Sequence, residues 1–145
     1  MSDVVLDISG LKTHFMTRRG VVKAVDGVSF TLRRGEILGL VGESGAGKSI
    51  TGFSILRLID EPGRIVDGRI VFEGEDLLAL PEAGMESIRG ARIAMVFQDP
   101  QTSLDPVFTI GNQIVEALQA HQALNRRQAR ARAVELLQAV GIPSP

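Results

Sequence analysis

The 145-residue chain has no cysteine, no tryptophan and no tyrosine, and only two histidines. The absence of cysteine excludes a disulfide scaffold and a thiolate metal site. His14 and His121 are too few for a histidine-rich metal centre. The formal net charge of -1 provides no basic field for non-specific binding of nucleic acid, so we expect no nucleic acid partner.

Long hydrophobic runs are also missing. The longest apolar run covers residues 37–42, far short of the roughly 18 residues that a membrane span requires. Residues 1–10 contain no basic stretch followed by an apolar one, so we expect no signal peptide. If the protein acts at a membrane, we expect partner proteins to hold it there.

Apolar residues recur with two distinct patterns along the first hundred residues. Alternation predicts strands at residues 4–9 and 28–32, and a β-branched stretch predicts another at 21–25. Short turns at 18–20 and 26–27 would connect these strands into antiparallel pairs. Residues 37–41 and 93–97 are continuously apolar, which predicts strands buried on both faces. A half-exposed strand is expected over residues 68–74.

Four helices are expected. The first covers residues 48–58, and a short one begins at Pro81-Glu82 and ends near Gly90. A third begins near Thr109. The fourth begins at Arg126 with Asn125 as its N-cap, and Gly141 ends it. Its expected apolar face comprises Val134, Leu137 and Val140.

A glycine-rich loop carries the clearest chemical signal. Residues 42–49, GESGAGKS, match the pattern G-x-x-x-x-G-K-[ST] at every fixed position. Glycines let backbone N–H groups surround a phosphate, and the following helix presents its positive N-terminus to the same anion. Lys48 would reach the β- and γ-phosphates and Ser49 would bind Mg²⁺. The loop therefore predicts a nucleotide site made by Gly42, Glu43, Ser44, Gly45, Ala46, Gly47, Lys48, Ser49 and Ile50.

Two acidic residues resemble part of a second nucleotide motif. Asp60 and Glu61 follow an apolar stretch, as the carboxylates of a Walker B motif do. They lie too close to Lys48 in the sequence, because a Walker B aspartate ends a strand beside the phosphate loop. We interpret them as a solvated helix terminus.

Three further stretches indicate which family of phosphate-loop proteins the chain resembles. They are GVVKAVDGVSF at residues 20–30, IAMVFQDP at 93–100 and TSLDPVFTIG at 102–111. Together with the loop they resemble the ATP-binding subunit of an ABC transporter, and more narrowly the importers of oligopeptides, dipeptides and nickel. The resemblance implies an α/β P-loop NTPase fold of ABC type. We expect a mixed sheet with antiparallel N-terminal strands in residues 1–105, and the start of a helical subdomain in residues 106–145.

The resemblance also assigns roles to single residues. Gln98 matches the Q-loop glutamine, which contacts Mg²⁺ and the surroundings of the attacking water; the alternative is a strand-end glutamine bonded to its own loop. Phe15 matches the aromatic residue that stacks on adenine; the alternative is a core residue. The implied ligands are ATP and Mg²⁺. The implied partners are membrane permease subunits, docked on the segment from Gln98 through the following helix, and a second ATP-binding subunit at the cytoplasmic face of the cell membrane.

Several motifs of the family do not occur in these 145 residues: the signature motif, the Walker B strand, the D-loop and the switch histidine. The chain therefore resembles the N-terminal part of an ATP hydrolase subunit that energises import of peptides or related small solutes. A non-hydrolysing nucleotide-binding fragment is the main alternative. A nucleoside kinase is disfavoured, because about three strands precede the loop. A DNA-repair ABC protein is disfavoured by the charge balance. The arginines at 126, 127, 130 and 132 are interpreted as a solvated helix face.

Overall fold

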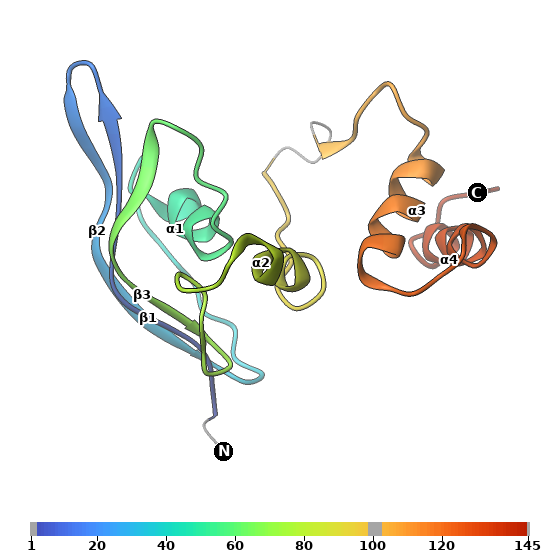
Figure 1. The fold of residues 1–145 in the computed structure, drawn as a ribbon, viewed down its shortest axis with the longest axis horizontal. Coiled ribbons are helices and arrows are strands. Elements are labelled where there is room, and N and C mark those ends of the chain that lie inside the picture. The colour runs from blue at the N-terminus through green and yellow to red at the C-terminus, as the bar shows by residue number, and fades with distance from the viewer. Residues whose placement is uncertain (1–2, 99–102, 145) are drawn as a thin grey trace. The chain divides into compact units, whose positions relative to one another are not determined.

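A computed structural model of the chain describes residues 3–98 and 103–144. The chain divides into two compact units, Met1–Arg89 and Gly90–Pro145. The first unit contains the sheet and two helices, and the second contains a helical hairpin (Figure 1).

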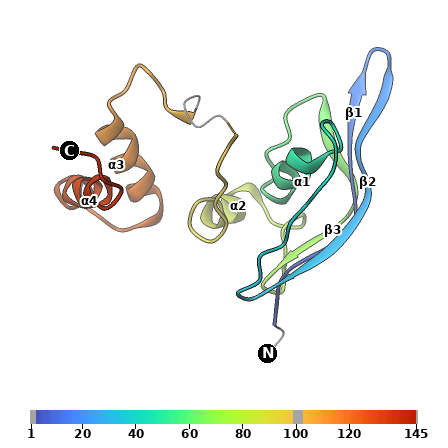
Figure 2. The same ribbon diagram turned by 180° about the vertical axis from the view of Figure 1, so that it is seen from behind.

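The sheet of the first unit has four antiparallel strands in the order β2-β1-β3-β4. Its strands are β1 (Val4–Thr17), β2 (Gly20–Arg33), β3 (Gly63–Phe72) and β4 (Glu75–Asp76). The long β1–β2 ribbon and β3 curve together, and α1 (Lys48–Ile55) lies against one face of them (Figures 1 and 2). The predicted antiparallel pairing near the N-terminus is confirmed, although β3 begins five residues earlier than expected.

The expected turn at Asp26-Gly27 is wrong, because β2 continues through it. Leu11 pairs with Val28 and Lys12 pairs with Asp26, so Gly27 is an extra residue in one strand of the ladder. Its φ of 84° lies in the left-handed region, which a glycine tolerates in a β-bulge. A glycine after an aspartate therefore produced a bulge inside one strand instead of a turn between two.

The core of the first unit lies between the inner face of the sheet and the segments that cover it. The buried residues Leu6 and Ile8 of β1 alternate with the less buried Asp7 and Ser9, as the sequence pattern predicts. The short helix α2 (Glu82–Ile88), at its predicted place, contributes two buried side chains. The buried apolar residues of this unit are Leu6, Ile8, Leu11, Val25, Leu56, Ile70, Phe72, Leu77, Met85 and Ile88.

Helix α1 ends at Ile55, earlier than the predicted Leu58. The N–H of Leu58 donates to the carbonyl of Phe53 at 2.8 Å, and the N–H of Arg57 donates to that of Ser54 at 3.1 Å. This pattern is a Schellman motif, which stops the helix. Arg57, with φ 53°, occupies the left-handed position where glycine is usual. Asp60 and Glu61 are exposed as expected, but they lie beyond the helix end.

The side chain of Arg57 ties this strained helix end to the segment after β4. Its guanidinium donates to the carbonyls of Leu77 at 3.2 Å and Leu80 at 2.6 Å. Arg89 donates from Nε to the carbonyl of Leu56 at 2.8 Å. Both arginines also pair with Glu82. Arg89 thus provides the carbonyl of the α1 C-cap with a cationic donor, which stabilises a helix end.

Both predicted buried strands are wrong. Residues 37–41 form no strand, and Ile37 and Val41 are 98% and 94% exposed. In residues 93–97 only Ile93 makes a bridge, and Val96 is 90% exposed. A strand buried on both faces needs a pairing partner and cover from other elements. The described part of the chain gives these segments neither, and its strand pairs are all antiparallel.

The second unit is built on α3 (Ile110–His121) and α4 (Arg126–Ala139). The side chain of Thr109 accepts from the N–H of Asn112 at 3.3 Å and so caps α3. Asn125 caps α4 in a reciprocal capping box with Gln128, and both bonds measure 3.0 Å. The predicted helix starts are therefore confirmed, as is the end at Gly141, whose φ is 79°.

The face that joins these two helices differs from the predicted one. Ala129 and Ala133 of α4 pack with Val115 of α3, whereas Val140 is 74% exposed. Alanines let α3 and α4 approach each other closely. The larger apolar side chains of Val134 and Leu137 are half-buried. Within the described residues, neither unit contains a helix that is long and apolar enough to cross a membrane.

Candidate functional site: the glycine-rich loop and α1

Residues 42–49 form an exposed loop that leads into α1. The N–H of Ala46 donates to the carbonyl of Glu43 at 3.1 Å, which makes a tight turn. Gly45 and Gly47 have φ angles of 81° and 83°. Side chains rarely adopt this conformation, so the backbone requires glycine at Gly47, a fixed position of the motif, and also at Gly45, a variable one.

Gly47 is also the N-cap of α1. Its carbonyl accepts from the backbone N–H of Thr51 at 2.8 Å and from the Thr51 hydroxyl at 3.0 Å. No side chain caps the helix here, and its first turn contains no acidic residue. The first N–H groups of α1 therefore remain available to an anion, as a phosphate site requires.

A close contact with β2 fixes the place of Gly47 on the sheet. A Cβ at this position would lie 2.2 Å from the carbonyl oxygen of Ala24 and 3.4 Å from Cγ2 of Val25. No side chain fits at that distance from a backbone atom. The glycine thus serves two purposes, because it permits the left-handed turn and lets the loop rest directly on β2.

Lys48 spans the opening of the loop. Its Nζ donates to the carbonyl oxygens of Gly42 at 2.7 Å and Glu43 at 2.6 Å. An ammonium has three donors, so these two bonds leave one for a phosphate oxygen. The side chain is half-buried. The ammonium is therefore held at the loop by the backbone that would surround the phosphate.

Ser49 is the next residue of α1 and is exposed, whereas Ile50 is half-buried. A serine hydroxyl at this position suits Mg²⁺, which prefers oxygen ligands and keeps several waters. The described residues contain no cluster of three or more histidines, aspartates or glutamates that could hold a metal by itself. A cation at the loop would therefore bind Ser49, water and the phosphates of a nucleotide, together with Gln98 in its predicted role.

Phe15 lies on β1 opposite Val22 of β2 and Gly63 of β3. A Cβ on Gly63 would lie 2.6 Å from Cε1 of Phe15 and 2.7 Å from Cγ2 of Ile59. The ring of Phe15 therefore packs over a strand position that only glycine leaves open, and it remains half-buried. Its stacking on adenine stays a prediction beside its contribution to the core.

Gln98 belongs to the second unit, where it is exposed in a bend. The residues that follow it in the predicted motif, Asp99 and Pro100, lie outside the described residues, as does Thr102. The glycine-rich loop belongs to the first unit, so the two parts of the predicted site lie in different units. The role of Gln98 stays a prediction.

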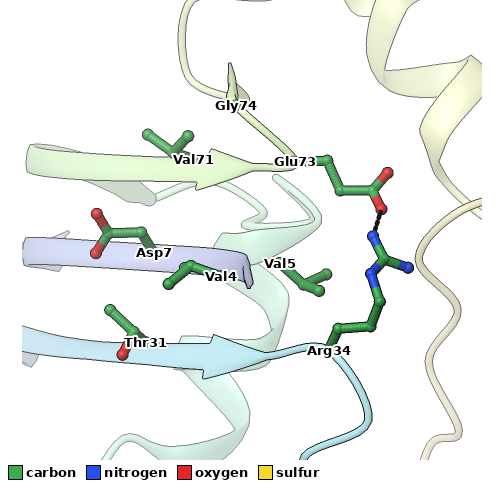
Figure 3. Close-up of a pocket in the computed structure, with 8 residues that line it drawn as sticks. All are labelled: Val4, Val5, Asp7, Thr31, Arg34, Val71, Glu73 and Gly74. Atoms are coloured by element: carbon green, nitrogen blue, oxygen red, sulfur yellow. Dashed lines mark hydrogen bonds and ion pairs between the residues drawn. The ribbon is translucent and has the colours of Figure 1, made fainter. Parts of the chain in front are cut away.

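A pocket of about 490 Å³ lies at one end of the sheet, away from the loop (Figure 3). Figure 3 shows Asp7, Thr31 and Val71 side by side on three strands, and the ion pair of Arg34 with Glu73 at 2.9 Å across the strand ends. The pocket is not the site that the motif predicts, and nothing in the sequence singled out its residues.

The ABC transporter family model matches residues 25–144 of the chain. The chain belongs to the ABC transporter family. Among curated members, it is 48% identical to the probable peptide ABC transporter ATP-binding protein y4tR of Sinorhizobium fredii, over 99% of this chain and 43% of that protein. It is 44% identical to the dipeptide transport ATP-binding protein DppD of Escherichia coli, over 97% of this chain and 43% of that one. The family resemblance and the α/β fold class of ABC type are thereby confirmed.

Other comparisons agree. The oligopeptide transport ATP-binding protein OppD of Bacillus subtilis is 48% identical over 97% of this ABC transporter chain and 40% of its own length. The fold is similar to a dimeric structure of MJ0796, a bacterial ABC transporter cassette, with a TM-score of 0.77 and 23% identity over 92% of this chain and 56% of that one. The chain thus spans about two-fifths of the length of these curated relatives.

Proposed function

We propose that the chain is the ATP-binding part of a subunit that hydrolyses ATP to energise import of peptides or related small solutes. The observation that carries this proposal is the bonding of Lys48 to Gly42 and Glu43, directly beside the uncapped N-terminus of α1. A cation and a row of free N–H groups at one exposed loop are complementary to a polyphosphate.

Each residue has a specific role in this proposal. The backbone of residues 42–49 and the ammonium of Lys48 hold the phosphates, and the hydroxyl of Ser49 holds Mg²⁺. Phe15 stacks on the adenine. Gln98 contacts Mg²⁺ and the surroundings of the attacking water. Hydrolysis of ATP then depends mainly on positioning and on stabilisation of charge at the transferred phosphoryl group.

The transported solute and the partners are inferred from relatives. The curated proteins that resemble this chain carry names that specify peptide, dipeptide or oligopeptide transport. The structure of MJ0796 is dimeric. We therefore propose that the whole protein pairs with a second ATP-binding subunit and is held by permease subunits at the cytoplasmic face of the membrane. Residues 99–106 belong to the proposed docking surface.

A second candidate is a nucleotide-binding chain that does not hydrolyse ATP. It is favoured by the absence of a signature motif and of Walker B carboxylates from these 145 residues. The two candidates share the nucleotide site and differ in turnover, so phosphate release distinguishes them.

Calorimetric titration of the chain with ATP in the presence of Mg²⁺ tests the nucleotide site. Hydrogen bonds from charged groups contribute about 1.5–3 kcal/mol, so Lys48→Ala should weaken binding by at least tenfold. Lys23→Ala is the matched control, because Lys23 is an exposed lysine that pairs with Asp26 at 3.2 Å. Equal affinity of the wild type and Lys48→Ala would contradict the proposed site.

A further inference from the structure

Helix α1 faces the sheet with hydroxyl groups. Its two buried residues are Thr51 and Ser54, and both are polar. A helix that packs on a sheet usually buries an apolar stripe. Hydrogen bonds are directional, so buried hydroxyls fix the orientation of α1 more narrowly than apolar contact would.

The hydroxyls form a chain between β1 and the first turn of α1. The Oγ atoms of Thr13 and Ser54 lie 2.7 Å apart, and Ser54 donates to the carbonyl oxygen of Ile50 at 2.7 Å. A serine hydroxyl has a single hydrogen, so Thr13 is the donor to Ser54 when Ser54 donates to Ile50. Both side chains are fully buried, which removes competition from water.

A second contact holds the same helix at its start. Gly47 rests on Ala24 of β2. Thr13 of β1 pairs with Val25, the residue that follows Ala24 in β2. Gly47 and Ser54 are seven residues apart, about two helical turns, and so lie on one face of α1. Two contacts on one helix face, made to neighbouring positions of paired strands, determine both the place and the rotation of α1.

We propose that Thr13 and Ser54 are positioning residues for phosphate binding, which fix the direction of the first N–H groups of α1, of Lys48 and of Ser49. The inference rests on the proposed function, because it concerns the same nucleotide site. Neither residue belongs to the glycine-rich motif, and neither lies in the loop.

Substitution of Thr13 tests the pair. Thr13→Val keeps the shape of the side chain but removes its hydroxyl, whereas Thr13→Ser keeps the hydroxyl. Thr13→Val removes the donor to Ser54, which keeps its bond to Ile50, so α1 loses its hydrogen bond to β1. We expect this to weaken the binding of ATP and Mg²⁺ by about 5- to 50-fold. We expect Thr13→Ser to bind within about twofold of the wild type. Without nucleotide, the amide hydrogens of residues 48–55 should exchange faster in Thr13→Val than in Thr13→Ser.

A control separates positioning from a general loss of stability. Leu6→Ala creates a cavity at the start of β1, seven residues from Thr13, which is more than about 20 Å along the strand. It should lower the stability of the unit and leave nucleotide affinity and the exchange of residues 48–55 unchanged. The proposal is overturned if Thr13→Val retains wild-type affinity and exchange, or if Leu6→Ala changes both by the same amount. Failure of the wild type to bind ATP would instead reject the proposed function.

Discussion

The carbonyl oxygen of Ala24 lies 2.2 Å from the position that a Cβ on Gly47 would occupy. The last glycine of the loop therefore rests on the backbone of β2 with no room for a side chain. The loop gains its shape from this contact as well as from its own turn.

Gly47→Ala should be strongly destabilising, because it adds a backbone clash to a left-handed conformation. Gly45→Ala is the matched control: its φ is 81°, but nothing lies within 4 Å of the added carbon. Conformational strain alone costs about 1–2 kcal/mol, and overpacking adds about 1–3 kcal/mol. We expect urea unfolding to show a loss for Gly47→Ala about twice that for Gly45→Ala. Equal losses would mean that β2 moves aside at no cost.

Phe15→Ala should weaken the binding of ATP without affecting the binding of inorganic tripolyphosphate. Stacking of an aromatic ring on a base contributes about 1–3 kcal/mol, and tripolyphosphate has no base. Titration of both ligands into the wild type and the variant measures the difference. If affinity for both ligands falls equally, then Phe15 acts through its packing against Gly63 and not through stacking.

The ion pair of Lys12 with Asp67 should make stability depend on pH. The hydrogen bond from Lys12, together with that from the N–H of Gly68, holds the pKa of Asp67 below its ordinary value of 3.8. A carboxyl group whose pKa is lowered by folding stabilises the fold above its unfolded pKa, and this contribution is lost as the pH falls through the lowered pKa. Asp67→Asn should therefore reduce the loss of stability on acidification.

The same pair predicts the opposite dependence at alkaline pH. The hydrogen bond to Asp67 raises the pKa of Lys12 above 10.5, so its contribution is present below that pH and is lost as the pH rises through the raised value. Both side chains are partly exposed, so added salt should weaken the effect. Urea unfolding of the wild type and Asp67→Asn between acidic and neutral pH measures how the free energy of unfolding falls with pH. Asp60→Asn, which substitutes an exposed aspartate, is the control. The prediction would be contradicted if Asp67→Asn lost as much unfolding free energy on acidification as the wild type does.

The 145-residue chain should bind ATP with Mg²⁺ and release no phosphate above background. It contains neither Walker B carboxylates to orient water nor a signature motif to face the γ-phosphate. Loss of one positioned donor alone typically lowers a rate by about 10²–10³. Steady-state phosphate release measures this. Turnover that Lys48→Ala abolishes would show that these 145 residues suffice for hydrolysis.

The sequence predicted the features that depend on local chemistry. The helix starts at Ile110 and Arg126 follow from Thr109 and Asn125, whose side chains satisfy N–H groups within one turn. The phosphate loop follows from its motif, in which Gly45 and Gly47 stand where the backbone has positive φ. Such features need only neighbouring residues, so a single sequence contains the information for them.

Features that depend on distant contacts were predicted less well. Residues 37–41 have the composition of a buried strand, but composition does not supply the neighbours that a buried strand needs. Gly27 produced a bulge because β1 pairs past it, which the dipeptide alone does not reveal. The buried pair of Thr13 and Ser54 gave no signal, since hydroxyl residues in a strand and in a short helix are ordinary taken separately.

The exposed segment 37–41 makes the chain prone to self-association. Its apolar side chains lie outside any strand, and it carries no charge that would oppose pairing with a second copy. Short uncharged apolar stretches of this kind assemble through backbone pairing between chains. Light scattering should accordingly rise with protein concentration, and dilute samples are the ones in which the chain behaves as a monomer.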